Sequence, residues 1–276
     1  MPSEMSRVVT RKPLIVIPVS APVKQAAFDL SATVSAAIRA AGETLQAGDV
    51  VAVSSKYTAI SEGRIVRLDD VQVSAEAEEI AARYSMNPRI TQLVLQEADH
   101  VFGGIPGFLL TFKDGILSPN AGLDRSNIPN GFAVLFPKHP YRSAEALRQA
   151  LRAEFGVNIG LILTDSWLMP GRLGTSGVAL ATAGFRPIQD ERGKTDLFGN
   201  PMLVTQRGIA DTICAAAELV MGERDEATPI VIVRNSNVTL GDFAVSEADV
   251  SISRHLDIYV QSLTDGRLER APAPGD

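Results

Sequence analysis

Two short segments carry side chains that could bind a metal ion. One is Leu161–Ser166, an apolar run that ends in a threonine, Asp165 and Ser166. The other is Ser118–Asn127, in which Asp124 stands among amide and hydroxyl side chains. Carboxylate and hydroxyl oxygens suit hard divalent cations such as Mg²⁺, and such cations usually serve phosphate groups. The two aspartates are therefore candidate metal ligands, and Ser166 could complete the coordination shell.

Each aspartate also has a purely structural interpretation. Asp124 suits an Asx turn, in which the side chain accepts a hydrogen bond from the backbone, and Asp165 could cap a loop or a helix. For either residue alone, the structural role is the commoner one. The occurrence of two such segments in one chain favours a metal site, and both interpretations stay open at this point.

Alternating strands and helices must position these residues. The hydrophobic pattern predicts strands over 14–19, 49–54, 65–68, 132–136, 159–164 and 229–233, and a β-hairpin over 108–117. Caps and helical spacing predict helices that begin at Asp29, near Ser74, at Pro88, at Ser143 and at Arg207. Glycine and proline predict a loop over 167–177. The fold class is α/β or α+β, and an aspartate at the carboxyl end of a strand would face a ligand crevice.

Three further segments carry groups that could contact an anionic ligand. Ser55 and Lys56 follow a predicted strand and could grip phosphate oxygens, although an exposed turn is their ordinary structural role. Gly222, in Met221-Gly222-Glu223, fits a helix C-cap whether or not a ligand lies nearby. Arg172, in the glycine-rich loop, could clamp a carboxylate or a phosphate, although loop arginines are usually only solvated.

Composition excludes several classes of protein. A net charge of −6 and the lack of a basic stripe argue against nucleic-acid binding. The single cysteine, Cys214, lies in an apolar helical pattern and excludes a disulfide framework, so we expect a core residue in a reducing compartment. No segment predicts a signal peptide or a membrane span, so we expect a cytoplasmic protein. The sequence has no P-loop, no Gly-x-Gly-x-x-Gly after the first strand and no His-Glu-x-x-His pair.

Several motifs follow one another in a collinear order. They are Gly48-Asp49-Val50-Val51, Ser61-Glu62-Gly63-Arg64, Asn120-Ala121-Gly122-Leu123-Asp124-x-Ser126-Asn127, Thr164-Asp165-Ser166, Asp196-Leu197-Phe198-Gly199, Ala210-Asp211, Met221-Gly222-Glu223 and Pro229-Ile230-Val231-Ile232-Val233-Arg234. This series resembles the coenzyme F420-0:L-glutamate ligase (F420 γ-glutamyl ligase) family from about Leu14 to Arg234. The element around Asn120 is its most specific part.

The resemblance implies an amide ligase that adds L-glutamate to coenzyme F420-0 with GTP hydrolysis. It implies a Mg²⁺ or Mn²⁺ site at Asp124 and Asp165, with Ser166 where the family usually has threonine. It also implies nucleotide contacts from Ser55, Lys56, Asn127 and the 221–228 segment, which includes Met221, Gly222 and Glu223. A homodimer with an α/β fold of mixed sheets and flanking helices, distinct from the P-loop fold, is expected. The ligase unit would span 1–276, with a domain over about 14–265 and tails at 1–12 and 271–276.

Two departures from the family pattern bear on the substrate. The family typically has Asp-Thr-x-Gly-Arg-Pro-x-Arg-x-Gly, whereas this chain has an apolar Trp167-Leu168-Met169 segment and keeps one arginine, Arg172. A lysine usual before the Ala-Glu-Gly motif is replaced by Ile60, although Lys56 could reach the same region. Lys56 and Arg172 are therefore the expected catalytic residues, with Arg172 as a clamp for an acidic substrate. The alternatives are a ligase that joins another carboxylate and amine, and a non-catalytic nucleotide-binding homologue.

Overall fold

The computed structural model describes residues 12–253 and 255–264, and its core is a five-stranded sheet in the order β1-β12-β2-β8-β9. The strands are β1 (Ile15–Val19), β2 (Val50–Ser54), β8 (Gly160–Leu168), β9 (Thr175–Ala183) and β12 (Ile230–Arg234). β2 and β8 are parallel, whereas the other neighbours are antiparallel. The parallel register ends where Ser54 pairs with Thr164, because β2 ends there whereas β8 continues to Leu168 beside β9.

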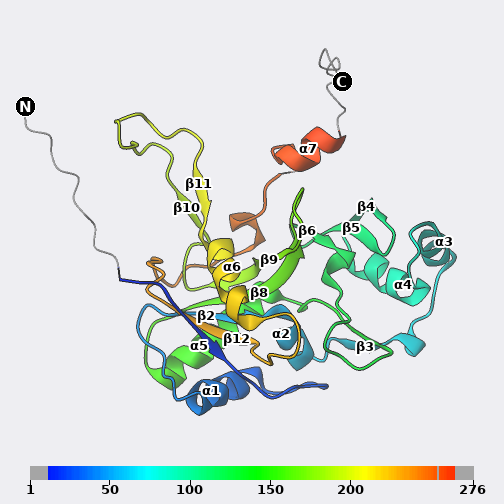
Figure 1. The fold of residues 1–276 in the computed structure, drawn as a ribbon, viewed down its shortest axis with the longest axis horizontal. Coiled ribbons are helices and arrows are strands. Elements are labelled where there is room, and N and C mark those ends of the chain that lie inside the picture. Colours follow the sequence, from blue (N-terminus) through cyan, green and yellow to red (C-terminus); the bar gives the residue numbers. More distant parts are fainter. Residues whose placement is uncertain (1–11, 254, 265–276) are drawn as a thin grey trace, which may run out of the picture.

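Helices cover both faces of this central sheet (Figure 1). α1 (Leu30–Ala40) and α5 (Pro140–Phe155) pack on one face, and α6 (Ile209–Met221) packs on the other. Apolar residues in β2 and β8 alternate between these two cores, which explains why both strands are almost continuously hydrophobic. α2 (Ser55–Ser61) begins directly where β2 ends.

A smaller body lies beside the central sheet, at the right in Figure 1. It contains a three-stranded antiparallel sheet, two helices and the 3₁₀ turn η2, which pack around a separate apolar cluster. Its elements are α3 (Ala75–Arg83), α4 (Pro88–Glu97), β4 (His100–Ile105), β5 (Phe108–Lys113), β6 (Ile116–Pro119) and η2 (Asn120–Gly122). A two-stranded ribbon of β3 (Ile65–Arg67) and β7 (Phe132–Val134) leads into and out of this body.

A two-stranded arm extends away from the central sheet (Figure 1). It is formed by β10 (Ile188–Asp190), β11 (Gln206–Gly208) and the segment that joins them. The remaining elements are the 3₁₀ turns η1 (Leu68–Asp70) and η3 (Glu247–Asp249) and the helix α7 (Ile258–Thr264). Within the described ranges, none of the helices is both long and apolar enough to cross a membrane.

The predicted fold class is confirmed, and most predicted elements are present. Asp29 caps α1 as expected, because its side chain accepts a hydrogen bond from Ala32 N. Asp114 and Gly115, with φ angles of 48° and 80°, form the predicted hairpin turn between β5 and β6. Cys214 is fully buried, as predicted. The predicted tails lie outside the described residues, apart from Lys12.

Four local predictions were wrong. The loop predicted over 167–177 is shorter than expected, since β8 continues to Leu168 and β9 begins at Thr175, which leaves only 169–174 between the strands. α5 begins at Pro140, so Ser143 lies inside the helix and does not cap it. The corner after β2 is the first turn of α2. β4 was not predicted, because its glycines and histidine mask the strand pattern.

Replacement of Gly177 by alanine is expected to lower the free energy of unfolding by about 2 kcal/mol. An added Cβ on this β9 residue would stand 2.4 Å from Cys214 O and 2.9 Å from Ala215 N, so α6 would have to move off the sheet. Urea denaturation measures the change. Gly208→Ala is the matched control, because its Cβ would meet its nearest atom, Asp211 Oδ2, at 3.4 Å. Equal stability of the two variants would contradict this close packing.

Candidate active site

An open pocket of about 440 Å³ lies where the parallel pairing of β2 and β8 ends. Its walls come from the start of α2, the 124–127 loop, the end of α6 and the 221–229 segment that follows α6. Six acidic residues line it, from segments far apart in the sequence: Asp124, Asp165, Glu218, Glu223, Asp225 and Glu226. The pocket therefore stands where an open α/β sheet is expected to bind its ligand.

Asp165 is the acidic residue that the central sheet itself supplies. The side chain of the buried Ser55 hydrogen-bonds to it, and its Oδ1 accepts a 2.9 Å hydrogen bond from Ser166 N. Burial raises the pKa of the Asp165 carboxyl to about 6, although these hydrogen bonds oppose the shift. The neighbouring Asp124 carboxylate adds to the increase. A carboxylate that is disfavoured in this way would gain from a bound cation.

Asp124 already has a cationic partner. Lys56 Nζ lies 2.6 Å from Asp124 Oδ2 and donates to Ser126 Oγ at 2.7 Å and Ser126 O at 3.0 Å. Burial acts to raise the pKa of the Asp124 carboxyl. The charge of Lys56 and the hydrogen bonds from Lys56 and Ser126 together outweigh this effect, so the pKa is lowered from its usual value. An ammonium has three hydrogens, and here each has an acceptor. Lys56 must therefore leave at least one of these acceptors before it can contact a ligand.

The predicted Asx turn is also present at this loop. Asp124 Oδ1 accepts a 2.7 Å hydrogen bond from Ser126 N, two residues further on. The structural role and the proximity to Asp165 are therefore compatible, because the turn fixes one carboxylate oxygen and directs the other towards Lys56. The alternative that Asp165 is a cap is wrong, since Asp165 lies within β8.

Glu218, Glu223 and Ser166 also line the pocket and interact with one another. Ser166 Oγ donates to Glu223 Oε1 at 2.5 Å, and Thr175 Oγ1 donates to the same oxygen at 3.2 Å. Burial raises the pKa of the Glu218 carboxyl to about 7, and its hydrogen bond with Glu223 and the charges of Glu223 and Asp165 act in the same direction. Glu218 Oε2 is buried and has no hydrogen-bond partner among the residues that the structure describes.

The structure brings together most of the residues singled out in the sequence. Lys56, Asp124, Asn127, Asp165, Ser166, Met221, Gly222 and Glu223 all line the pocket. Asn127 Nδ2 lies 3.4 Å from Glu223 O, and Ser55 lies beneath the pocket as a partner of Asp165. Gly222, with φ of 71°, is the C-cap of α6 as predicted. Arg172 is exposed in the turn between β8 and β9 and does not line the pocket.

Sequence reasoning missed Glu218, Thr175 and the Ala21–Lys24 rim of the pocket. Glu218 carries a signal that could have been used. It lies one helical turn before Met221 and is an acidic residue in an otherwise apolar stretch of α6. Thr175, which contacts Glu223, and the rim carry no such signal, since only tertiary contacts bring them to this site.

Carboxylates from separate elements line one pocket of an α/β fold, and the sequence has no P-loop. A model of the family described as F420-0:gamma-glutamyl ligase matches residues 18–235. The Coenzyme F420:L-glutamate ligase of Methanopyrus kandleri is 38% identical over 200 residues, which are 72% of this chain and 79% of the relative. The relative of the same name from Methanothermobacter thermautotrophicus is 34% identical over 77% of this chain and 85% of the relative. The relative from Haloarcula marismortui is 39% identical over 74% of this chain and 80% of the relative.

The chain belongs to the F420-0:γ-glutamyl ligase family. The resemblance inferred from the collinear motifs is thereby confirmed. The matched region includes every residue that lines the pocket, from Ala21 to Pro229.

Proposed function

We propose that this protein adds L-glutamate to coenzyme F420-0 in a reaction that converts GTP to GDP and phosphate and requires Mg²⁺ or Mn²⁺. The description of the family names F420-0, and the names of the relatives include coenzyme F420 and L-glutamate, which supports the two substrates. The observation that carries the proposal is the convergence of Asp165 and Asp124 on one pocket at the end of the parallel strand pair. Amide formation needs an activated carboxylate and an amine held in position, and both tasks suit an open pocket that positions reactants.

Oxygen donors of the kind that a hard divalent cation prefers support the metal site, although the described residues contain no group of three or more His, Cys, Asp or Glu placed to hold a metal ion by themselves. Asp165 and Asp124 offer carboxylate oxygens, Ser166 offers a hydroxyl, and the buried Oε2 of Glu218 lacks a partner among the described residues. When bound, such a cation would neutralise charge on the nucleotide phosphates. We assign it to Asp124 and Asp165, with Ser166 as a further ligand. Lys56, Ser55, Asn127 and the 221–223 segment would hold the nucleotide.

The proposal is tested by a ligation assay with purified protein, F420-0, glutamate, GTP and Mn²⁺, analysed by mass spectrometry. The expected product has gained at least one glutamate, and it requires both the nucleotide and the metal ion. ATP in place of GTP tests the choice of nucleotide, and EDTA tests the metal requirement. Release of GDP without a glutamylated product would refute F420-0 as the acceptor. Tight nucleotide binding without turnover would instead support a non-catalytic homologue.

A second candidate is a related ligase that joins a different carboxylate and amine. The turn between β8 and β9 favours it, because Leu168, Met169 and Leu173 are exposed there and make an apolar surface. Arg172, the proposed clamp for an acidic substrate, lies in this turn. If F420-0 fails as a substrate, aromatic carboxylates without the phosphate of F420-0 are the acceptors to test next. Arg172→Ala should then leave their turnover unchanged.

The affinity for Mn²⁺ is expected to weaken about tenfold for each pH unit below pH 6. The pKa of Asp165 is raised to about 6, so below that pH the metal ion must displace a proton, whereas above it the carboxylate is already charged. A titration that follows the electron paramagnetic resonance signal of free Mn²⁺ from pH 5 to 8 measures this dependence. The variant Glu218→Gln is measured in parallel, because the pKa of Glu218, at about 7, also lies in this range. A constant affinity from pH 5 to 8 would contradict the assignment.

We also propose that the chain forms a homodimer through its arm. Leu197, Phe198, Leu203 and Val204 on the arm are between 74% and 95% exposed, which is unusual for a group of large apolar side chains. Light scattering during gel filtration is expected to give twice the mass of the 29.4 kDa chain. Phe198→Glu should give the mass of one chain, whereas the control Leu263→Glu, on the exposed side of α7, should not. A wild-type protein with the mass of one chain would refute the dimer.

A further inference from the structure

The two aspartates of the pocket belong to different parts of the fold. Asp165 lies on β8 of the central sheet. Asp124 is held by the ribbon and the smaller body, because its backbone exchanges two 2.9 Å hydrogen bonds with Val134 of β7. The preceding turn is tied to β5, where Asn120 Oδ1 accepts from Leu109 N at 2.8 Å. The separation of the two carboxylates therefore depends on how the smaller body is held against the central sheet.

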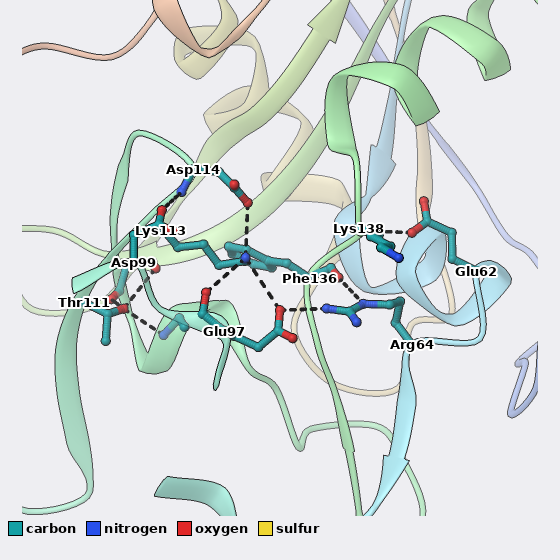
Figure 2. Close-up of polar contacts among 11 residues, drawn as sticks. Glu62, Arg64, Glu97, Asp99, Thr111, Lys113, Asp114, Phe136 and Lys138 are labelled. Carbon is teal, nitrogen blue, oxygen red and sulfur yellow. Dashed lines mark hydrogen bonds and ion pairs between the residues drawn. The ribbon is translucent and has the colours of Figure 1, made fainter. Parts of the chain in front are cut away.

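Arg64 joins these two parts, as Figure 2 shows. It follows α2, and its Nε donates to Phe136 O at 3.0 Å, at the end of the segment that follows β7. Its Nη2 lies 2.7 Å from Oε2 of Glu97, which is the last residue of α4 in the smaller body. The backbone carbonyl of Arg64 also accepts a 3.0 Å hydrogen bond from Leu135 N. Arg64 thus links the segment after α2 to two others, the segment after β7 and the end of α4.

Lys113 completes the group from the side of the smaller sheet (Figure 2). Its Nζ donates to Glu97 O at 3.1 Å and lies 3.6 Å from Glu97 Oε2 and 3.2 Å from Asp114 Oδ2. The side chains of Arg64, Glu97 and Lys113 are 23%, 16% and 13% exposed, so solvent screens their charges only partly. Loss of one member would leave a partly buried charge without its partner, which is a costly arrangement.

Glu62 anchors the same end of α2 to the start of α5. Its Oε2 accepts from Lys138 N at 2.8 Å and its Oε1 accepts from Ser143 Oγ at 2.6 Å. α2 therefore has the pocket at one end, where Ser55 and Lys56 lie, and this group of ion pairs just beyond the other end. A short, rigid helix transmits a shift of either end to the other.

We propose that Arg64 and Glu97 are positioning residues, which clamp α2 and the segment after β7 to α4 and so fix the approach of Asp124 to Asp165. The inference rests on the proposed metal-dependent function. Neither residue lines the pocket, so both act through the two aspartates. A metal ion demands near-ideal ligand distances, and a displacement of about 1 Å in a catalytic arrangement can cost about a hundredfold in rate. Loosening the clamp should therefore affect metal binding before it unfolds the protein.

The test compares Glu97→Gln with the control Glu79→Gln, which removes the same charge from an exposed ion pair on α3. Mn²⁺ affinity is measured without nucleotide from the signal of free Mn²⁺, and the melting temperature is measured without metal. Glu97→Gln is expected to bind Mn²⁺ about tenfold more weakly and to turn over more slowly. Replacement of residues that orient metal ligands typically lowers metal affinity or activity about 10- to 100-fold. Glu79→Gln should match the wild-type protein in both measurements. Glu97→Asp, which keeps the charge, should recover part of the affinity.

Arg64→Lys provides a second test of the inference if a Glu97 variant fails to fold. It keeps the charge but cannot reach Phe136 O and Glu97 at once in the planar geometry of a guanidinium group, so the same loss of affinity is expected. Wild-type Mn²⁺ affinity in folded variants, with only a lower melting temperature, would show a purely structural role and overturn the inference. Absence of Mn²⁺ binding by the wild-type chain would overturn the proposed function itself. The two failures are distinguished by the wild-type titration.

Discussion

Replacement of Asp165 by asparagine is expected to lower the ligation rate about a thousandfold without destabilising the protein. Asparagine has nearly the same shape but no charge, so the proposed cation loses a ligand that would supply several kcal/mol, and about 4 kcal/mol corresponds to a thousandfold. The folded protein should not suffer, because the raised pKa of Asp165 means that the pocket disfavours the charged form. The melting temperature without metal should therefore stay the same or rise at pH 8.

The loss of rate and the gain in stability are measured on the same preparations. Turnover comes from the mass-spectrometric assay at saturating GTP and glutamate, and melting is followed by circular dichroism with EDTA present. Asp69→Asn is the control, because its carboxylate is exposed and pairs with Arg89 in the smaller body. A variant that keeps more than about a tenth of the wild-type rate would remove Asp165 from the proposed metal site.

The part of the site that the sequence could predict is the part set by local pattern. Asp165 follows an apolar run whose pattern predicts a buried strand, and a carboxylate at the end of such a run is expected to face a ligand crevice. Asp124 accepts a hydrogen bond from the backbone N–H of Ser126, two residues further on, which is also a local arrangement. Both predictions rest on neighbours in the chain, and both aspartates line the pocket.

Long-range partners were beyond prediction, because nothing in the sequence links them. Lys56 was expected near phosphate oxygens, yet it pairs with Asp124, and 70 residues separate it from Ser126, its other partner. Ser143 looked like a helix cap but donates to Glu62, since Pro140 had already begun the helix. Trp167 looked like part of a loop, but its ring stacks on that of Phe136, with centroids 6.4 Å apart, and this packing keeps the end of β8 extended.

Replacement of Lys56 by methionine should have opposite effects on metal binding and on turnover. The Lys56 ammonium competes with any cation for Asp124 Oδ2, from which it is separated by 2.6 Å. Its removal should therefore tighten the binding of Mn²⁺ in the absence of nucleotide, while Ser126 still orients the carboxylate through Asp124 Oδ1. Turnover should fall about a hundredfold, because a charge-assisted contact to phosphate contributes about 1.5–3 kcal/mol and methionine cannot supply it.

Tighter Mn²⁺ binding together with slower turnover would distinguish the exchange of Lys56 for a metal ion at Asp124 from a general electrostatic effect. Lys24→Met is the control, since Lys24 also lines the pocket but its ammonium lies 5.1 Å from the centroid of the Phe28 ring. If the charge of the pocket alone mattered, both variants would bind Mn²⁺ more tightly and lose nucleotide affinity to a similar degree. If Lys56 holds Asp124 until the metal ion arrives, only Lys56→Met should combine tighter Mn²⁺ binding with the large loss of turnover. Weaker Mn²⁺ binding by Lys56→Met would instead mean that the ammonium organises Asp124 for the cation.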